Sequence, residues 1–231
     1  MGQPARRLEL AGILPPAMAR TFGARGSGGV LATGLEALDH ALGGGFPRGA
    51  ITEILSAPGH DGDWLALRAM LAANGACAVL DHDGSFHPPG AAARGLDLAR
   101  LLVVRETRRK QALWALERMA REPGLAVVLA SLPGLTDTML RRLQLAAESS
   151  GQVLLLMQSG DARASWGALR VRVRGEPGEG ARRLLLEVLR TRGGRLPHPV
   201  RIEIDDDFTG AVRASAVLSH AAADAQPRKL A

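Results

Sequence analysis

The chain has 231 residues and a formal net charge of +6, with 46% hydrophobic and only 3% aromatic residues. This suffices for one α/β domain with an aliphatic core, and the scarcity of aromatic side chains argues against a base-stacking platform for single-stranded nucleic acid. Cys77 is the only cysteine, which excludes a disulfide framework and a cysteine-rich zinc site and indicates a reducing compartment. No apolar stretch approaches the ~18 residues of a membrane span, so we expect a cytoplasmic protein.

The first 29 residues precede the expected domain and form a segment too short to fold alone. Its apolar side chains include Leu10, Ile13, Leu14, Met18 and Phe22. We expect this segment either to pad the domain or to dock on a partner. The glycine-rich run at 23–29 then predicts a flexible linker.

The domain is expected to span residues 30–218 and to begin with a helix. Thr33 is predicted to cap this helix, with Glu36 three residues on completing a capping box. Consecutive glycines at 43–45 end the helix, and a short strand follows at Ala50–Leu55.

The central part of the chain alternates apolar runs with amphipathic segments, which predicts a parallel, doubly wound sheet. Expected strands cover residues 76–80, 101–104, 125–130 and 153–157. Expected helices cover residues 64–74, 111–121 and 136–149, with a short helical turn at 91–94.

The pattern changes after Trp166. Strand-like and alternating segments at 169–174, 184–190 and 200–204 predict an antiparallel extension with one arginine-rich face toward solvent. The Ala-rich end, residues 219–231, is predicted to be disordered.

The order and spacing of these segments resemble the core of the RecA recombinase. Residues 31–54 are similar to the opening of that core, and residues 20–27 to the end of RecA's N-terminal polymerisation segment. Further segments resemble RecA's catalytic-glutamate strand, magnesium-aspartate strand, nucleotide-sensing strand and late hairpin, at 75–88, 125–135, 153–158 and 190–204. The resemblance implies an α/β fold with a mostly parallel, doubly wound sheet and an antiparallel C-terminal extension.

Residues 50–67 have the outline of a phosphate-binding loop, in which a strand, a glycine-bearing turn and a helix follow one another. An active loop of this kind ends in Gly-Lys-Ser/Thr, whose lysine neutralises phosphate and whose hydroxyl holds Mg²⁺. Depending on the register, Gly62 and Asp63, or Asp63 and Trp64, replace the lysine and the hydroxyl residue. Both registers therefore lack the cation and the metal ligand.

The same loop keeps Gly59 and brings the carboxylates of Asp61 and Asp63 near the phosphate position. A carboxylate ~4 Å from a phosphate charge costs about 4 kcal/mol at an effective dielectric constant of 20. Affinity for phosphate then falls roughly a thousandfold, beyond the effect of the missing lysine.

The other catalytic positions are also incomplete. The resemblance places Asp83 where RecA carries its catalytic glutamate, one methylene shorter, and Gln158 at its sensor glutamine. Ala130 and Ser131 stand where RecA has Asp-Ser, so the magnesium aspartate is missing. Because phosphoryl transfer needs the whole set together, we predict a pseudo-ATPase that is not an enzyme and uses no cofactor.

Shortened loops separate the chain further from RecA, whose two DNA-binding loops follow the regions that match Leu135 and Gln158. A RecA-like core with degenerate ATP motifs and shortened loops resembles the ImuA family, bacterial accessory proteins of damage-induced mutagenesis. This resemblance implies an ImuB-type Y-family polymerase relative, an error-prone replicative-type polymerase and RecA as partners. It also implies weak or indirect DNA contact and association with the nucleoid on DNA damage. RecA docks on a neighbouring subunit through the equivalent N-terminal segment, which implies self-association here.

Two runs of basic residues permit a functional and an ordinary interpretation. The first comprises Arg105, Arg108, Arg109 and Lys110, and the second comprises Arg170, Arg172 and Arg174. Each run either binds DNA or an acidic partner surface, or is a solvated face. We favour the solvated face for each run.

The sequence Asp81-x-Asp83, with His82 and His87 nearby, permits a metal site at the carboxyl end of a strand. We favour a polar loop that remains from a catalytic ancestor, because no second ligand cluster is evident.

The tryptophans Trp64, Trp114 and Trp166 each adjoin an apolar periodic segment. This favours packing in the core or against another subdomain over stacking on bases.

The function that these features favour is a non-catalytic RecA-like adaptor in the bacterial SOS response to DNA damage. It supports error-prone translesion synthesis by docking on a polymerase-like partner, on RecA, or on both. A weak DNA-binding ATPase of the RecA family is the alternative, which the arginine content and Asp83 keep open. A cell-division inhibitor of the damage response is a third interpretation, since relatives of this fold family are used in that way.

Overall fold

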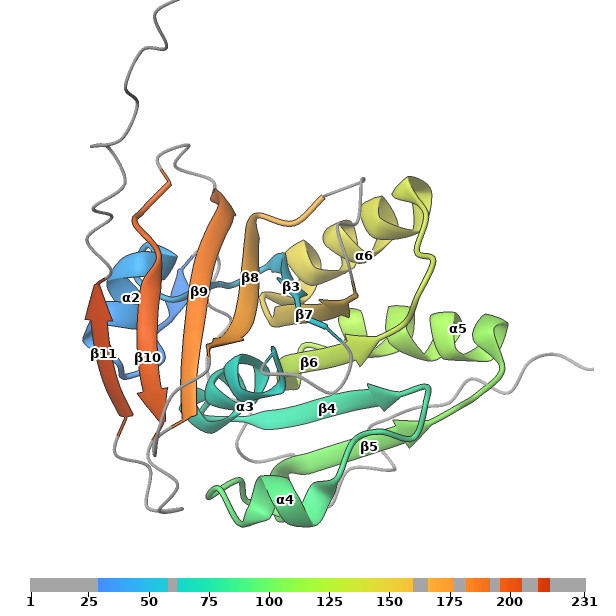
Figure 1. Cartoon of the computed structure of the whole chain (residues 1–231). Helices are drawn as coiled ribbons and strands as arrows, with labels where there is room; N and C mark the ends of the chain where they lie inside the picture. The colour runs from blue at the N-terminus through green and yellow to red at the C-terminus, as the bar shows by residue number, and fades with distance from the viewer. Residues whose placement is uncertain are drawn as a thin grey trace, which may run out of the picture.

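The computed structural model describes residues 29–57, 62–159, 166–176, 182–191, 196–204 and 212–216, the last stretch by its backbone alone (Figure 1). The predicted N-terminal docking segment and the predicted disordered tail lie outside the described residues. So do Gly59 and Asp61 of the loop that resembles a phosphate-binding loop.

In the described residues, nine strands form one sheet in the order β11-β10-β9-β8-β3-β7-β6-β4-β5. The strands are β3 (Ala50–Leu55), β4 (Ala76–Asp81), β5 (Leu101–Arg105), β6 (Leu125–Ser131), β7 (Val153–Gln158), β8 (Leu169–Glu176), β9 (Arg182–Thr191), β10 (Val200–Ile204) and β11 (Val212–Ala216). All neighbours from β8 to β5 pair in parallel, and β8 to β11 pair antiparallel. The predicted α/β fold with an antiparallel extension is therefore confirmed.

Helices lie on both faces of this sheet. They are α2 (Glu36–Leu42), α3 (Gly62–Ala72), α4 (Pro88–Ala92), α5 (Arg109–Ala120) and α6 (Asp137–Ser150), with a 3₁₀ turn η2 at Leu98–Arg100. Helices α2, α3 and α4 contribute to one apolar core, and α5 and α6, which lie side by side, contribute to the other (Figure 1). None of the described helices is long and apolar enough to cross a membrane.

The central strands β3 and β4 are buried along their whole length because each of their faces meets one of these cores. In β3, Ile54 belongs to the core beside α3, and Ile51 to the core beside α5 and α6. Such strands appear in the sequence as continuous apolar runs, which is why residues 76–80 and 125–130 were recognisable as strands.

The start of α2 differs from the prediction. The helix begins at Glu36 with Leu35 as its N-cap residue, and no side chain caps it. Asp39, inside the helix, accepts hydrogen bonds from the backbone amides of Thr33 (2.6 Å) and Gly34 (3.1 Å). The predicted capping box is wrong, because the Thr33 amide binds the carboxylate of Asp39 and not that of Glu36. The Thr33 hydroxyl accepts a hydrogen bond from the Leu35 amide.

Two pairings were not predicted from the sequence. Val30–Leu31 (β1) pairs antiparallel with Phe46–Pro47 (β2) in a two-stranded sheet. Gly45, at a φ of 130°, permits this pairing, because a Cβ atom there would lie 2.3 Å from the Leu31 carbonyl oxygen. The short strand β11 was also missed.

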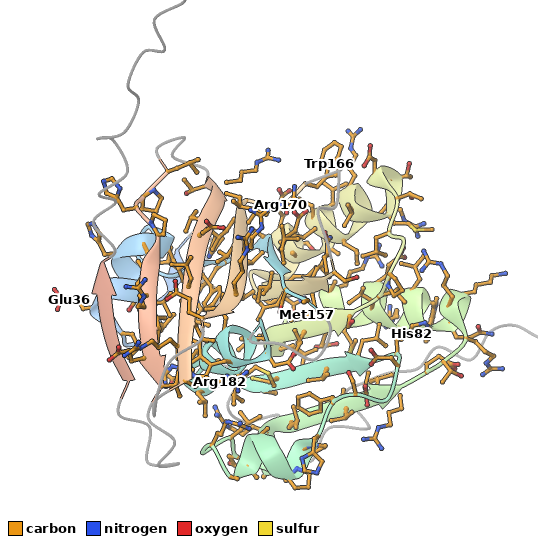
Figure 2. All side chains as sticks on the ribbon, viewed as in Figure 1. Glu36, His82, Met157, Trp166, Arg170 and Arg182 are labelled. Carbon is orange, nitrogen blue, oxygen red and sulfur yellow. The ribbon has the colours of Figure 1, made fainter. Side chains whose placement is uncertain are left out.

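A buried ion pair joins the parallel and antiparallel parts of the sheet. Glu53 of β3 is paired in register with Arg170 of β8, and its Oε2 lies 3.5 Å from the Arg170 Nε. The Glu53 side chain is fully buried, and that of Arg170 is only 14% exposed. Glu53 Oε1 also accepts hydrogen bonds from the amides of Trp166 (3.1 Å) and Gly167 (3.3 Å), so this carboxylate fixes the chain where it enters β8. Trp166 and Arg170 are labelled at this place in Figure 2.

We expect Glu53→Ala to lower the free energy of unfolding by about 3–5 kcal/mol, because it leaves the buried Arg170 guanidinium without its carboxylate. Urea denaturation followed by circular dichroism measures the change. The matched control is Glu187→Ala, which removes a partly exposed partner of Arg172 and Arg174 and is expected to cost about 1 kcal/mol or less. Equal losses in the two variants would contradict the role assigned to the buried pair.

Candidate functional site

The candidate site lies at the carboxyl ends of the parallel strands, where α/β sheets place their binding sites. Strand pairing aligns Asp81 of β4 with Ser131 of β6, and Ser131 with Met157 of β7. The helix α3 begins beside the same ends with Gly62 and Asp63. The fold therefore brings together the described residues that sequence analysis assigned to a degenerate nucleotide site.

Gly62 opens α3 in a space too small for any other residue. It is buried, and its amide donates a hydrogen bond to the Ser56 hydroxyl (3.2 Å) at the end of β3. A Cβ atom on residue 62 would lie 2.7 Å from Cε of Met157 and 2.8 Å from Cβ of Ser56. The Met157 methyl can move, whereas the Ser56 Cβ is fixed to the backbone. A lysine at position 62 therefore does not fit the structure as it stands.

Asp63 follows in the first turn of α3, where it is exposed. A carboxylate is favourable at the amino end of a helix, where the unpaired amides carry partial positive charge. The negative charge of the Asp63 carboxylate repels a phosphate at this end of the helix. Position 63 therefore stabilises α3 and disfavours the anion that such a helix end commonly binds.

Asp81, the last residue of β4, is a buried structural carboxylate. Its Oδ1 accepts a hydrogen bond from the amide of Phe86 (3.2 Å), and its Oδ2 accepts one from Nε of Arg105 (2.9 Å). The His82 ring lies against the segment that follows β5, with its Nδ1 2.8 Å from the carbonyl oxygen of Glu106. In the described part of the chain, no group of three or more His, Cys, Asp or Glu side chains is placed to hold a metal ion.

The resemblance assigns Asp83 to the position of RecA's catalytic glutamate, and the structure places it at the surface. Its Oδ1 accepts hydrogen bonds from the hydroxyl (2.7 Å) and the amide (3.1 Å) of Ser85. The Ser85 hydroxyl, above all, holds the pKa of Asp83 below its ordinary value. A carboxylate with a lowered pKa accepts a proton more weakly than an ordinary aspartate, which is unfavourable in a general base.

The ends of β6 and β7 complete the site. Ala130 is fully buried, and Ser131 is half-buried at the strand end. The backbone carbonyl of Gln158 accepts a hydrogen bond from the Ser56 amide (3.1 Å), which ties β7 to the end of β3. The side-chain Oε1 of Gln158 is buried, and no hydrogen-bond donor reaches it within the described residues. Ala130 has no carboxylate to hold Mg²⁺, and Gly62 has no cation to neutralise a phosphate. The described residues therefore do not fit a magnesium nucleotide.

A cleft of about 200 Å³ opens beside these strand ends, between α3 and α4. Apolar side chains from α3 and the strands line part of it, namely Leu67, Met70, Val79, Leu129 and Met157. Polar side chains lining it include Asp63, Asp83, Ser85 and Arg94. Sequence analysis missed this cleft because α4 and the loop before it are placed only by tertiary contacts.

The first basic run is tied into local contacts. Arg105 pairs with Asp81, and Arg108 makes a bidentate pair with Glu106 at 3.1 Å for both contacts. Arg109 donates to the carbonyl oxygens of Pro133 and Gly134, and Lys110 is exposed at the start of α5.

The second basic run lies along β8. Arg170 belongs to the buried pair with Glu53, and Arg172 and Arg174 share the carboxylate of Glu187 at 3.5 and 3.9 Å. Carboxylates thus offset much of the positive charge of this strand.

The tryptophans divide between core and surface. Trp64 packs against the core beside α3, as predicted. Trp114 and Trp166 are 48% and 42% exposed, so neither of them is a core residue. Trp114 lies on α5, and Trp166 precedes β8, where the apolar neighbours in the sequence bury their own side chains and leave the indole outside.

We expect Gly62→Lys to lower the free energy of unfolding by about 1–3 kcal/mol, because the new side chain overpacks the contact with Ser56 and Met157. It is also expected not to confer ATP binding. Thermal unfolding and titration calorimetry measure the two effects. The control is Gly29→Lys, since no atom lies within 4 Å of a Cβ atom at that position. A Gly62→Lys variant as stable as the parent and able to bind ATP would contradict the steric argument.

We expect Ser85→Ala to raise the pKa of Asp83 toward the ordinary aspartate value of about 3.9, because the hydroxyl that favours the ionised form is removed. Because its pKa is lowered in the folded protein, ionised Asp83 stabilises the parent protein at any pH above the ordinary aspartate pKa. This stabilisation is lost as the pH falls through the lowered pKa. An NMR titration of the Asp83 carboxyl carbon measures the shift. Ser149→Ala on α6 is the control and is expected to leave the Asp83 pKa unchanged.

Comparison with known proteins gives a consistent family. Residues 24–158 match the family model described as the RecA N-terminal domain. Over 103 residues the chain is 38% identical to protein RecA of Chlorobaculum parvum. This matched region covers 43% of this chain and 30% of that protein. It is also 38% identical over 104 residues to protein RecA of Deinococcus radiodurans, covering 43% of this chain and 29% of that protein.

The chain therefore spans only about 30% of the length of these curated relatives. A crystal structure of the RadB recombinase matches the fold with a TM-score of 0.63 at 19% identity. That match covers 76% of this chain and 96% of the RadB chain, and it supports the fold.

Proposed function

Since this chain belongs to the RecA N-terminal domain family, we propose that it is a non-catalytic member that acts as an adaptor in the bacterial response to DNA damage. In this proposal it is an ImuA-type protein and supports error-prone translesion synthesis. It docks on an ImuB-type polymerase relative, and RecA and an error-prone replicative-type polymerase are further partners.

The packing of Gly62 is the observation that carries the proposal. In the ungapped register, the phosphate-binding lysine of a working loop would stand at position 62, where Ser56 and Met157 leave no room for a Cβ atom. In the shifted register it would stand at position 63, where the exposed Asp63 carries the opposite charge. At position 62 the loss is not reversible by one mutation, because Ser56 and Met157 occupy the space. This favours a nucleotide site that has been given up over one that is merely weakened.

Three further observations support the same interpretation. Ala130 is buried at the position of the magnesium aspartate, so no ligand oxygen is available there. Asp83 is held ionised by Ser85, and Asp63 adds a second carboxylate close to the helix end. The carboxylates disfavour binding of a polyphosphate. The chain lacks the lysine and the magnesium ligand, and it keeps only a weakened base at Asp83.

The surface of the protein supports a role in protein contacts. Trp114 and Trp166 expose large apolar areas on different elements, and exposed tryptophans are frequent anchors of protein interfaces. The basic runs are largely paired with carboxylates, which favours weak or indirect DNA contact over a dedicated phosphate-binding surface. The N-terminal segment with Leu10 and Phe22 remains the proposed site of self-association or partner docking.

The adaptor proposal predicts two results. The full chain gives no heat of binding with ATP and Mg²⁺ in calorimetry, and it does not hydrolyse ATP with or without single-stranded DNA. After DNA damage, the tagged full chain retains a polymerase-like partner or RecA, and Trp114→Ala or Trp166→Ala reduces this retention.

Other outcomes would identify the rival functions. DNA-stimulated hydrolysis that is lost in Asp83→Ala, with a salt-dependent gel shift, identifies a weak DNA-binding ATPase. Filamentous growth on induction, without retention of any polymerase-like partner, identifies a cell-division inhibitor. Either result would overturn the adaptor proposal.

A further inference from the structure

The cleft beside the emptied site combines an apolar wall with an acidic rim. Asp63, Leu67 and Met70 project into it from α3, spaced so that they share one face of the helix. Phe86 lines it from the loop that follows β4. The cleft measures about 200 Å³, larger than the engineered cavity of about 150 Å³ that takes up benzene. It is therefore large enough for one extended side chain.

The charges around the cleft favour a cation. Asp63, Asp81 and Asp83 line it, and Arg94 is the one guanidinium among the described lining residues. Arg94 Nη1 donates to the carbonyl oxygen of Gly90 (3.2 Å), and Arg105 from outside the lining pairs with Asp81. The net charge of the lining is negative.

The other titratable side chain at the cleft is His87. Its Nδ1 accepts a hydrogen bond from the Gly90 amide (3.1 Å), a contact that requires this nitrogen to be unprotonated and that caps α4. His87 adds no positive charge in that form, so the lining stays acidic.

Asp83 has an oxygen available for a ligand. Both hydrogen bonds that it receives from Ser85 end on Oδ1. Neither of them uses Oδ2. Like any exposed aspartate, Asp83 is charged at neutral pH.

These features together select an amphipathic cation. Phosphate is repelled by the carboxylates, and a purely apolar ligand would desolvate them without compensation. Arginine has an apolar stem that packs on apolar walls and a planar cation that binds carboxylates and stacks on aromatic rings. Lysine lacks both the planar fork and the stacking face.

We propose that this cleft binds the side chain of an arginine presented by a partner protein, with the guanidinium at Asp63 and Asp83 and the stem against Leu67, Met70 and Phe86. The inference rests on the proposed function, because a nucleotide bound at the start of α3 would compete for the same rim. It adds to that function one contact by which the adaptor recognises its partner.

The chain's methionines offer a direct test. The test uses full-length protein labelled with ¹³C at the methionine methyls. Met70 and Met157 line the cleft and report on it, whereas Met119 of α5 and Met139 of α6 lie outside its lining and serve as internal controls. The probe is the peptide acetyl-Ala-Arg-Ala-amide at millimolar concentration. We expect saturable shifts of the Met70 and Met157 methyls and none of the other two. The control peptide carries citrulline, which has the shape of arginine without its charge, and is expected to bind about threefold to tenfold more weakly.

Variants locate the contact. Asp83→Asn is expected to weaken the arginine peptide about threefold, because it removes one exposed ion pair and keeps the size of the side chain. Glu36→Gln is the matched control, since this exposed carboxylate lies on α2, away from Met157 (Figure 2). Its affinity is expected to equal that of the parent.

The outcomes separate this inference from the proposed function. Absence of shifts at Met70 and Met157, or equal binding of the citrulline peptide, overturns the arginine site. If ATP with Mg²⁺ shifts Met157 in the same protein, the proposed loss of nucleotide binding is wrong as well. If neither probe produces a shift, the arginine site fails and the proposed function stands.

Discussion

The close approach of β3, β7 and the start of α3 determines what this site can do. Gly62 is held between Ser56 and Met157 at distances that leave no room for a Cβ atom. Its amide is directed at the Ser56 hydroxyl, and the Ser56 amide donates to the Gln158 carbonyl. These two amides thus hold elements of the protein together. In a phosphate-binding loop, groups of the same kind are directed at the ligand.

The carboxylates around this point are divided between structure and surface. Asp81 is buried and fixes the turn after β4 through Phe86 and Arg105, whereas Asp83, two residues later, is exposed and contacts Ser85. A similar division separates the arginines of β8, where Arg170 is buried against Glu53 and Arg174 is largely exposed beside Glu187. The burial of each group decides its energetic weight, because an ion pair removed from water is costly to break and an exposed one is not.

Much of the candidate site followed from the order of the residues along the chain. The absence of lysine at 62 and 63 and of aspartate at 130 is a property of the sequence, and parallel strands necessarily bring their carboxyl ends to one edge. The sequence did not predict the cleft between α3 and α4, the buried Glu53–Arg170 pair or the exposure of Trp114. Each depends on which side chains meet across elements that are distant in sequence, and hydrophobic periodicity carries no information on that.

Local patterns also gave one wrong result that shows where this limit lies. Thr33 and Glu36 have the spacing of a capping box, yet Asp39 reaches back to the Thr33 and Gly34 amides first. Spacing identifies the groups that are able to cap a helix, and the path of the preceding chain selects among them. Here that path is set by Gly34, at a φ of 80°, and by the nearby pairing of Leu31 with Phe46.

The sequence by itself determined the alternation of strands and helices, the aliphatic core and the missing catalytic side chains, because these depend on composition and on the period of apolar residues. The tertiary structure decided that residue 62 has no room for a side chain. It also decided which charges are buried and that an acidic cleft lies beside the site. These properties arise from close contacts between residues far apart in the sequence, such as Gly62 and Met157 or Glu53 and Arg170.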